Sequence, residues 1–298
     1  MAVEKIGFIG LGMMGHGMAK NIVEKGYPLF IAGHRSRTAV EDLVRRGATE
    51  LTSPAEVAQA ATIVFLCVSA SPQVEAVVRG SSGLKAGAHE GLVVVDCSTS
   101  DPNSTLALAA ELAPLGVTFI DAPLSRTPKE AWEGTLDCMV GADTATFERV
   151  RPVISTWAGK IVHVGGLGDG HKMKLLNNFI AMGYAALYAE ALALSQKSGI
   201  SPQTFDSVIR GGRMDCGFYQ TFMRYALERD ENAHKFSLAN AAKDMRYLEA
   251  MANAAGIANP VGNAVKNTFA AAVASGHAEA YVPMISDIVA AGNGTKLT

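Results

Sequence analysis

Apolar residues in the first half of the chain follow two spacings. Short, nearly continuous runs of Val, Ile, Leu and Phe predict buried strands. They cover residues 4–9, 29–33, 62–68, 92–96, 117–121, 136–140 and 161–164. Between them, apolar residues three and four positions apart predict helices over 38–46, 54–60, 72–79 and 103–115. Strands that are apolar along their whole length and alternate with helices predict an α/β fold, with a mostly parallel, doubly wound sheet covered on both faces.

The pattern changes near Gly165, because no strand-like run follows Asp169. Apolar residues recur there at helical spacing and predict a long helix over 170–197 and another that starts at Ser201-Pro202. Further helices are expected over 218–229, 237–254, 260–274 and 281–291. We therefore predict two domains, a Rossmann-type α/β domain over residues 1–164 and an all-α C-terminal domain over residues 165–298.

A glycine-rich turn follows the first predicted strand. It consists of Gly10, Leu11, Gly12, Met13, Met14 and Gly15, and a helical pattern over residues 16–25 comes directly after it. Glycines at this spacing allow a tight turn, a close approach of the backbone to a pyrophosphate, and close packing of helix on strand. The N-terminus of the helix then offers free N–H groups to the phosphates. The turn therefore predicts a dinucleotide-binding site.

Composition excludes several other classes of protein. Of the 298 residues, 49% are hydrophobic and the formal net charge is −2, so the chain has material for a large core and no bias toward a nucleic-acid or membrane partner. No apolar run approaches membrane-spanning length. The four cysteines lack the spacing of a metal site or a disulfide framework. We expect a cytoplasmic protein without a metal.

The end of the second predicted strand indicates which dinucleotide binds. Rossmann folds usually place Asp or Glu there to bind the adenine ribose. Here Gly33 is followed by His34, Arg35, Ser36 and Arg37. Because guanidinium groups bind a 2′-phosphate, the segment favours NADP over NAD, with NAD still possible. The alternative, a solvated loop of arginines, stays open.

A lysine at the start of the long helix is the candidate for acid–base chemistry. Lys174 and Asn178 lie four positions apart and share one helical face, with His171 one turn earlier. A lysine whose pKa is moved toward neutrality can exchange a proton with the oxygen of a carbonyl that gains or loses hydride. From the residues alone, a surface position for Lys174 stays open.

The chain resembles the β-hydroxyacid dehydrogenases, a family that includes 3-hydroxyisobutyrate dehydrogenase, tartronate semialdehyde reductase and glyoxylate/succinic semialdehyde reductase. The resemblance covers nearly the whole chain and rests on motifs in matching order. They are Phe8 to Gly15, Cys67-Val68-Ser69, Asp96-Cys97-Ser98-Thr99, Asp121-Ala122-Pro123-Leu124-Ser125, the Gly168 to Asn178 run with Lys174, and Lys243-Asp244.

The resemblance implies a role for each matching residue. Lys174 is the general acid/base, Asn178 orients the substrate, and Asn177 is a second candidate for that role. Thr99 lies beside the nicotinamide, and Lys243 reaches the cofactor or closes over the site. Cys67 and Val68, after the strand at 62–68, are further cofactor-binding candidates.

One motif departs from the family pattern. The family commonly has Ser-Gly-Gly after Asp-Ala-Pro-x, where this chain has Ser125, Arg126 and Thr127. An arginine there favours a more anionic head group on the substrate, and sulfolactaldehyde reductases of the same family resemble the chain in carrying Arg-Thr. The alternative, an outward-pointing Arg126 beside an ordinary carboxylate pocket, stays open.

These observations predict an NAD(P)-dependent oxidoreductase that interconverts a small anionic β-hydroxy acid and its semialdehyde. Three alternatives remain: a reductase of a sulfonated aldehyde, an imine reductase, and a non-catalytic NADP-binding redox sensor. An Ala-rich face of the long helix, which invites close packing inside the protomer or between subunits, favours a homodimer or homotetramer. The sequence leaves the particular substrate and the physiological direction open.

Overall fold

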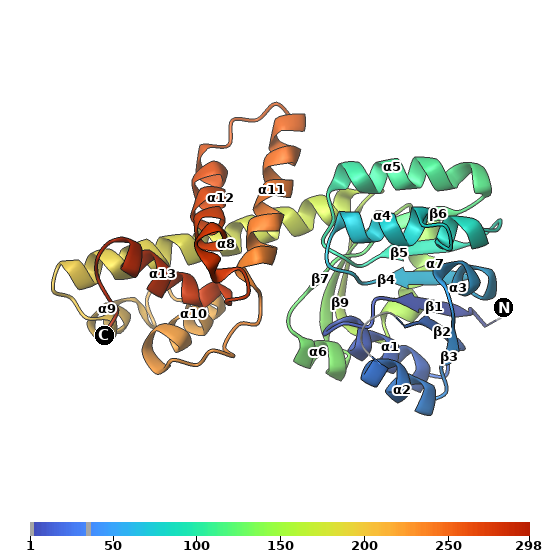
Figure 1. Cartoon of the computed structure of the whole chain (residues 1–298), viewed down its shortest axis with the longest axis horizontal. Helices are drawn as coiled ribbons and strands as arrows, with labels where there is room; N and C mark the ends of the chain where they lie inside the picture. Colours follow the sequence, from blue (N-terminus) through green and yellow to red (C-terminus); the bar gives the residue numbers. More distant parts are fainter. Residues whose placement is uncertain (1–2, 34–36) are drawn as a thin grey trace. The chain divides into compact units, whose positions relative to one another are not determined.

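The computed structural model describes residues 3–33 and 37–298. The chain divides into two compact units, of which the first ends at Lys174 and the second is Leu175–Thr298 (Figure 1). Three predicted cofactor residues, His34, Arg35 and Ser36, lie outside the described residues.

Nine strands form one sheet in the described part of the first unit. They are β1 (Ile6–Ile9), β2 (Leu29–Ala32), β3 (Thr49–Leu51), β4 (Ile63–Leu66), β5 (Val93–Asp96), β6 (Thr118–Asp121), β7 (Leu124–Ser125), β8 (Leu136–Gly141) and β9 (Ala158–Gly165). Their order is β3-β2-β1-β4-β5-β6-β8-β7, with β9 paired to β8. Neighbours from β3 to β6 are parallel, and β8 is antiparallel to β6 and β7. The predicted mostly parallel sheet is confirmed.

Helices cover both faces of this sheet (Figure 1). One face carries α1 (Gly15–Glu24), α2 (Arg37–Arg45), α6 (Pro128–Glu133) and α7 (Thr144–Ile154). The other carries α3 (Pro54–Ala60), α4 (Ser71–Arg79) and α5 (Pro102–Leu112). Successive strand side chains point to opposite faces, so Val93 and Val95 join the first core and Val94 the second. Burial on both faces is the reason that these strands are apolar throughout.

The structure adds short elements that apolar spacing did not predict. β3 has three residues and is largely exposed at the edge of the sheet, and β7 has two. Thr127 is the N-cap of α6: its side chain and that of Glu130 form a capping box, and Pro128 is the first residue of the helix. A Thr-Pro-x-Glu sequence is a known start signal for a helix, so α6 could have been predicted from these residues.

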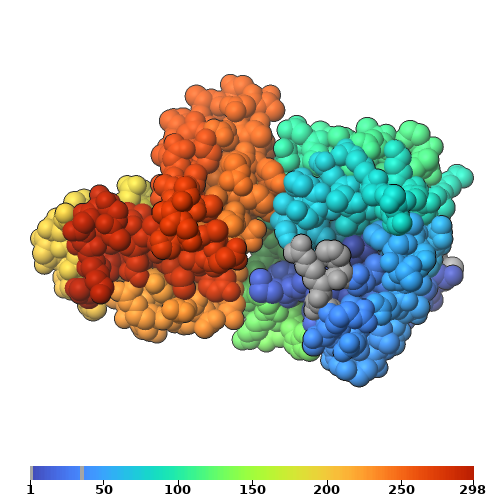
Figure 2. Space-filling view, in the orientation of Figure 1, coloured from blue at the N-terminus to red at the C-terminus, as the bar shows by residue number. Residues whose placement is uncertain are grey.

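The second unit is helical, and all of its residues are described. Between Leu175 and Thr298 the β structure is limited to an isolated bridge between Ser237 and Tyr281. The helices are α8 (Asp169–Lys197), which starts in the first unit, α9 (Pro202–Ile209), α10 (Gly217–Glu228), α11 (Leu238–Ala254), α12 (Pro260–Ala272) and α13 (Ile285–Gly292). Figure 2 shows them in yellow to red as one continuous body. The predicted start of the last helix at 281 was wrong, because a short 3₁₀ turn over Val282–Met284 precedes it.

The Ala-rich face of α8 packs inside the protomer. Ala185, Ala189 and Ala193 are buried in the core of the second unit against residues of α10 and α11. Small side chains there let neighbouring helices approach closely. In the described residues, no helix is long and apolar enough to cross a membrane.

Candidate active site

The glycine turn after β1 has the shape that a dinucleotide requires. Gly10 has a φ of +101°, and a Cβ on it would lie 2.2 Å from the Cys67 carbonyl oxygen. A Cβ on Gly15 would lie 1.9 Å from the Gly10 carbonyl oxygen, so α1 packs directly on the turn. A Cβ on Gly12 would meet nothing within 4 Å, so the backbone there is open to a pyrophosphate. The three glycines therefore fit the cofactor that the sequence predicts.

The other residues of the turn divide between core and surface. Leu11 is buried and Met14 packs against the core, whereas Met13 is two-thirds exposed. The first turn of α1 carries no acidic side chain, so nothing there repels a phosphate. The turn is thus anchored by Leu11 and Met14 and presents its backbone outward.

The carboxyl ends of the central strands meet at one edge of the sheet. Ile9 of β1 pairs with Leu66 of β4, Leu66 with Asp96 of β5, and Asp96 with Asp121 of β6. The strand order reverses between β1 and β4, which is the point where ligands of doubly wound sheets bind. The segments after these strands therefore border the glycine turn.

Two of these segments are tied together by hydrogen bonds. The Val68 N–H, after β4, donates to Ser98 Oγ at 3.0 Å. The buried Asp96 carboxylate accepts from the Ser98 N–H at 2.9 Å and from the Ser100 hydroxyl at 2.8 Å. Thr99 lies between these two serines, so its backbone is held on both sides. The predicted cofactor residues Cys67, Val68 and Thr99 thus share one edge with the glycine turn.

A carboxylate that the sequence pattern does not predict lies beside the residue that follows β2. A Cβ on Gly33 would lie 3.2 Å from Oε1 of Glu50, which comes from β3. Glu50 forms an ion pair with Arg37, with 2.5 Å between Arg37 Nη1 and Glu50 Oε1. Arg37 hydrogen-bonding lowers the pKa of the Glu50 carboxyl. Because β3 is short and exposed, nothing in the sequence pattern placed this acid beside β2.

Lys174 lies in the first turns of α8 and contacts a predicted substrate residue. Its half-buried amine donates to Ser125 Oγ at 3.3 Å, and Ser125 ends β7. Lys172 instead pairs with Asp169 at 3.0 Å, and 45% of its side chain is exposed. The two lysines therefore contact different partners, Asp169 and Ser125.

Asp121 fixes the start of α8. Its carboxylate accepts from the Gly168 and His171 N–H groups, each at 2.6 Å. These donors lie at the positive end of the helix, where a carboxylate is stabilising. Burial raises the pKa of the Asp121 carboxyl. Since Asp121 ends β6, it fixes the first turn of α8 at the edge of the sheet that carries the glycine turn. Asp121 opens the Asp121-Ala122-Pro123-Leu124-Ser125 motif, which by itself does not reveal this role.

Asn178 and Lys243 converge on one acid in the second unit. Asp244 is fully buried in α11, and its Oδ2 accepts from Asn178 Nδ2 at 2.6 Å. Lys243 Nζ lies 3.2 Å from Asp244 Oδ1. Asp244 therefore fixes which way the Asn178 amide faces, a role that a motif alone did not reveal. Asn177 is exposed, and its Nδ2 lies 3.4 Å from Asn178 Oδ1.

Arg126 adopts a backbone conformation that suits glycine. Its φ is +87°, at the position where the family commonly has Gly. Its half-exposed guanidinium donates through Nε to Asp137 Oδ1 at 3.0 Å. A left-handed conformation costs an ordinary residue about 1–2 kcal/mol. The next residue, Thr127, caps the N-terminus of α6.

The structure thus groups the predicted residues in two sets. Within the first unit it brings the glycine turn, Cys67, Val68 and Thr99 to one edge and places Lys174 on Ser125. Within the second unit it joins Asn178 and Lys243 through Asp244. Over residues 3–33 and 37–298, no group of three or more His, Cys, Asp or Glu side chains is placed to hold a metal ion.

Two family models match the chain. The model of the NAD-binding domain of 6-phosphogluconate dehydrogenase matches residues 5–165, and that of the NAD-binding domain of NADP-dependent 3-hydroxyisobutyrate dehydrogenase matches residues 168–285. A pyridine-nucleotide turn and these matches define an NAD(P)-dependent oxidoreductase of hydroxy acids and their semialdehydes. The chain belongs to the β-hydroxyacid dehydrogenase family.

Individual relatives cover most of the chain. It is 34% identical to 2-hydroxy-3-oxopropionate reductase from Escherichia coli over 81% of this chain and 82% of that one. It is 30% identical to 3-sulfolactaldehyde reductase from E. coli, with 91% of each chain covered. The solved structure of 3-hydroxyisobutyrate dehydrogenase from Mycobacterium tuberculosis with L-serine has a TM-score of 0.86 and 27% identity over 97% of this chain and 99% of that one.

Proposed function

We propose that this enzyme interconverts a small anionic β-hydroxy acid and its semialdehyde, with Lys174 as the general acid/base. The observation that carries the proposal is the Lys174 amine on the Ser125 hydroxyl, on a helix that Asp121 starts at the cofactor edge of the sheet. A lysine held there has the reach and chemistry to give a proton to a carbonyl oxygen.

Each residue has one task in this reaction. Bound NAD(P)H supplies the hydride to the carbonyl carbon. Lys174 donates the proton to the carbonyl oxygen during reduction and takes it back from the hydroxyl during oxidation. Asn178, oriented by Asp244, holds the substrate, with Asn177 as its neighbour. Ser125, Arg126 and Thr127 bind its anionic end. Positioning and proton transfer suffice for this chemistry.

The proposed cofactor is NADP(H), with NAD(H) as the weaker alternative. The segment after Gly33 carries Arg35 and Arg37 and no carboxylate of its own. The nearby Glu50 is neutralised by its ion pair with Arg37, so it repels a 2′-phosphate less than an unpaired acid would. The glycine turn holds the pyrophosphate, and Cys67, Val68, Thr99 and Lys243 complete the site.

The test is a turnover screen with both cofactors over a panel of semialdehydes. The panel contains glyoxylate and the succinic, tartronate and methylmalonate semialdehydes, together with sulfolactaldehyde. We expect NADPH oxidation with an anionic aldehyde at a kcat/KM at least tenfold above that with NADH. NADPH binding without turnover of any aldehyde would favour the non-catalytic redox sensor. Turnover of imines alone would favour an imine reductase.

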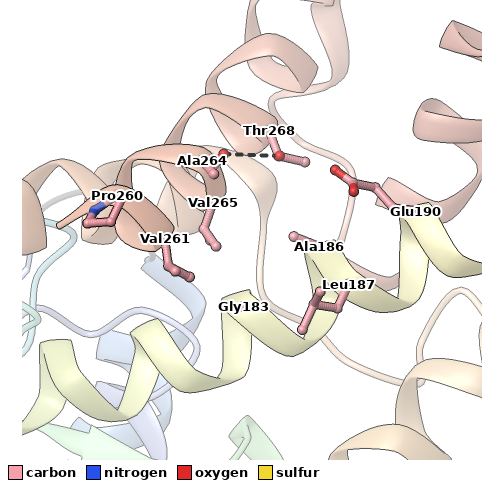
Figure 3. Close-up of a pocket in the computed structure, with 9 residues that line it drawn as sticks. All are labelled: Gly183, Ala186, Leu187, Glu190, Pro260, Val261, Ala264, Val265 and Thr268. Atoms are coloured by element: carbon pink, nitrogen blue, oxygen red, sulfur yellow. Dashed lines mark hydrogen bonds between the residues drawn. The ribbon is translucent and has the colours of Figure 1, made fainter.

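We further propose that the enzyme is a cytoplasmic homodimer or homotetramer. The outward face of α8 in the second unit is apolar at helical spacing, with Ile180, Leu187 and Leu194 each more than half exposed. Beside it, α8 and α12 line a shallow apolar groove of about 350 Å³ (Figure 3). Exposed apolar patches of this kind mark interfaces.

Light scattering tests this proposal. We expect a mass of two or four chains for the wild type. Leu187→Glu places a charge on the rim of the groove and is expected to lower that mass, whereas Val208→Glu, at an exposed apolar position on α9, serves as the control. A single-chain mass for the wild type would contradict the proposal.

A further inference from the structure

A fully buried histidine lies one turn before Lys174. His171 has no exposed surface, and its imidazole contacts two other elements of the first unit. Nδ1 lies 2.7 Å from Thr105 Oγ1 of α5, and Nε2 lies 3.1 Å from the Ser98 carbonyl oxygen after β5. A carbonyl oxygen only accepts hydrogen bonds, so Nε2 carries a proton and donates it. Both ring nitrogens are thereby committed to named partners.

Two buried carboxylates flank the ring. Asp96 Oδ2 is 3.7 Å from Nε2, and Asp121 Oδ2 is 3.8 Å from Nδ1. Both acids are buried at the ends of neighbouring strands. Burying an imidazole is unfavourable unless its ring nitrogens are hydrogen-bonded, and an apolar side chain of similar volume would fill the same space without that cost. Packing alone therefore does not account for a histidine at this position.

The partners of His171 belong to the segments that form the cofactor edge. Ser98, which accepts from Nε2 through its carbonyl, also accepts the Val68 N–H through its hydroxyl. The His171 N–H is held by Asp121 at the end of β6. One side chain therefore connects the first turn of α8 to the segments after β4 and β5. Lys174 follows three residues later on the same helix.

We propose that His171 is a positioning residue, which fixes Lys174 relative to the backbone at Val68 and Thr99 where the nicotinamide binds. The proposal rests on the proposed function of Lys174. Hydride and proton transfer both need their groups placed to within about 1 Å, and a misplacement of that size costs about 10²-fold in rate. Loss of the His171 contacts with Ser98 and Thr105 therefore lowers kcat more than it weakens the binding of aldehyde or cofactor.

The experiment compares three substitutions of histidine in the first unit. His171→Leu removes both polar contacts and keeps an apolar filling. His171→Gln retains a donor for the Ser98 carbonyl. His163→Leu is the matched control, because His163 also contacts a backbone carbonyl, that of Ala142 at 2.7 Å, and its ring stacks on Phe147 of α7. Thr105→Val, which removes the hydroxyl partner, replaces His171→Leu should that variant fail to fold.

We expect His171→Leu to lower kcat 30- to 100-fold with less than a threefold change in KM for the aldehyde. His171→Gln should recover to within fivefold of the wild type, Thr105→Val should lose three- to tenfold, and His163→Leu should stay within twofold. In a Lys174→Ala background, His171→Leu should lower the remaining rate less than threefold. An undiminished effect in that background, or an equal loss in His163→Leu, would overturn the positioning role.

A second measurement separates this proposal from the proposed function. If the wild type turns over no aldehyde, or if Lys174→Ala is as active as the wild type, the function assigned to Lys174 fails. The accessibility of the Lys174 amine is then measured as its rate of acylation by acetic anhydride, which peptide mass spectrometry quantifies. His171→Leu should expose the amine and raise its acylation rate at least threefold over His163→Leu. Equal rates would overturn the proposal.

Discussion

Lys174→Ala is expected to lower kcat for aldehyde reduction by about 10²–10⁴-fold, the contribution that a positioned general acid makes. The amine is held by the Ser125 hydroxyl at 3.3 Å, so its removal leaves the carbonyl oxygen to be protonated by water. The glycine turn does not depend on Lys174, so the affinity for NADPH should change less than threefold. Initial rates from NADPH absorbance and fluorescence titration of the cofactor measure the two effects.

Lys172 provides the matched control for this prediction. It lies on the same helix, has 45% of its side chain exposed and pairs with Asp169. Exposed ion pairs of this kind contribute about 0–1 kcal/mol, so Lys172→Ala should stay within twofold of the wild type in kcat. A Lys174→Ala variant that keeps a tenth or more of wild-type activity would exclude Lys174 as the general acid.

The sheet and its cofactor edge could be predicted from sequence because the signals are local. β1, β4 and β5 are fully buried four-residue strands of mainly apolar residues, and Gly10 and Gly15 occupy positions where a Cβ would collide with the backbone. The same holds for the helical spacing that separates Lys174 from Lys172. Such features depend on residues that are close together along the chain.

The partners that orient the site could not be predicted, because they depend on pairing between distant segments. Asp244 meets Asn178 from 66 residues away, and Asp121 meets the His171 N–H from 50 residues away. The position of Glu50 beside the end of β2 could not be predicted for the same reason, since it depends on the pairing of β3 with β2. A sequence motif can include an acid such as Asp121 or Asp244, but only the register of the strands and the packing of the helices show which groups its carboxylate binds.

The Ala-rich face of α8 illustrates a different limit. Its small residues indicated close packing, and sequence alone left open whether the partner was the same chain or another. The structure buries Ala185 and Ala189 within the protomer, and the exposed face carries larger side chains such as Leu187 and Leu194. Helical periodicity shows that two faces differ, but it does not show which one a neighbouring element covers.

Substitution of Arg126 is expected to change which aldehydes the enzyme prefers. A hydrogen bond to a charged group contributes about 1.5–3 kcal/mol, so Arg126→Ala should lower kcat/KM for an anionic aldehyde roughly 10- to 150-fold. A neutral aldehyde of similar size should lose less than threefold. Asp137 holds the guanidinium by Nε, and the second edge of the group, formed by Nη1 and Nη2, has the geometry to bind an anion.

The backbone at Arg126 supplies the control. Its φ of +87° disfavours both Arg and Ala and suits Gly. Arg126→Gly should therefore be more stable than Arg126→Ala by about 1 kcal/mol in urea unfolding, while both lose the same preference for anionic aldehydes. That combination would show that the chain tolerates a strained arginine for the sake of its charge. Equal losses on anionic and neutral aldehydes would remove Arg126 from the substrate site and leave its ion pair with Asp137 as its only role.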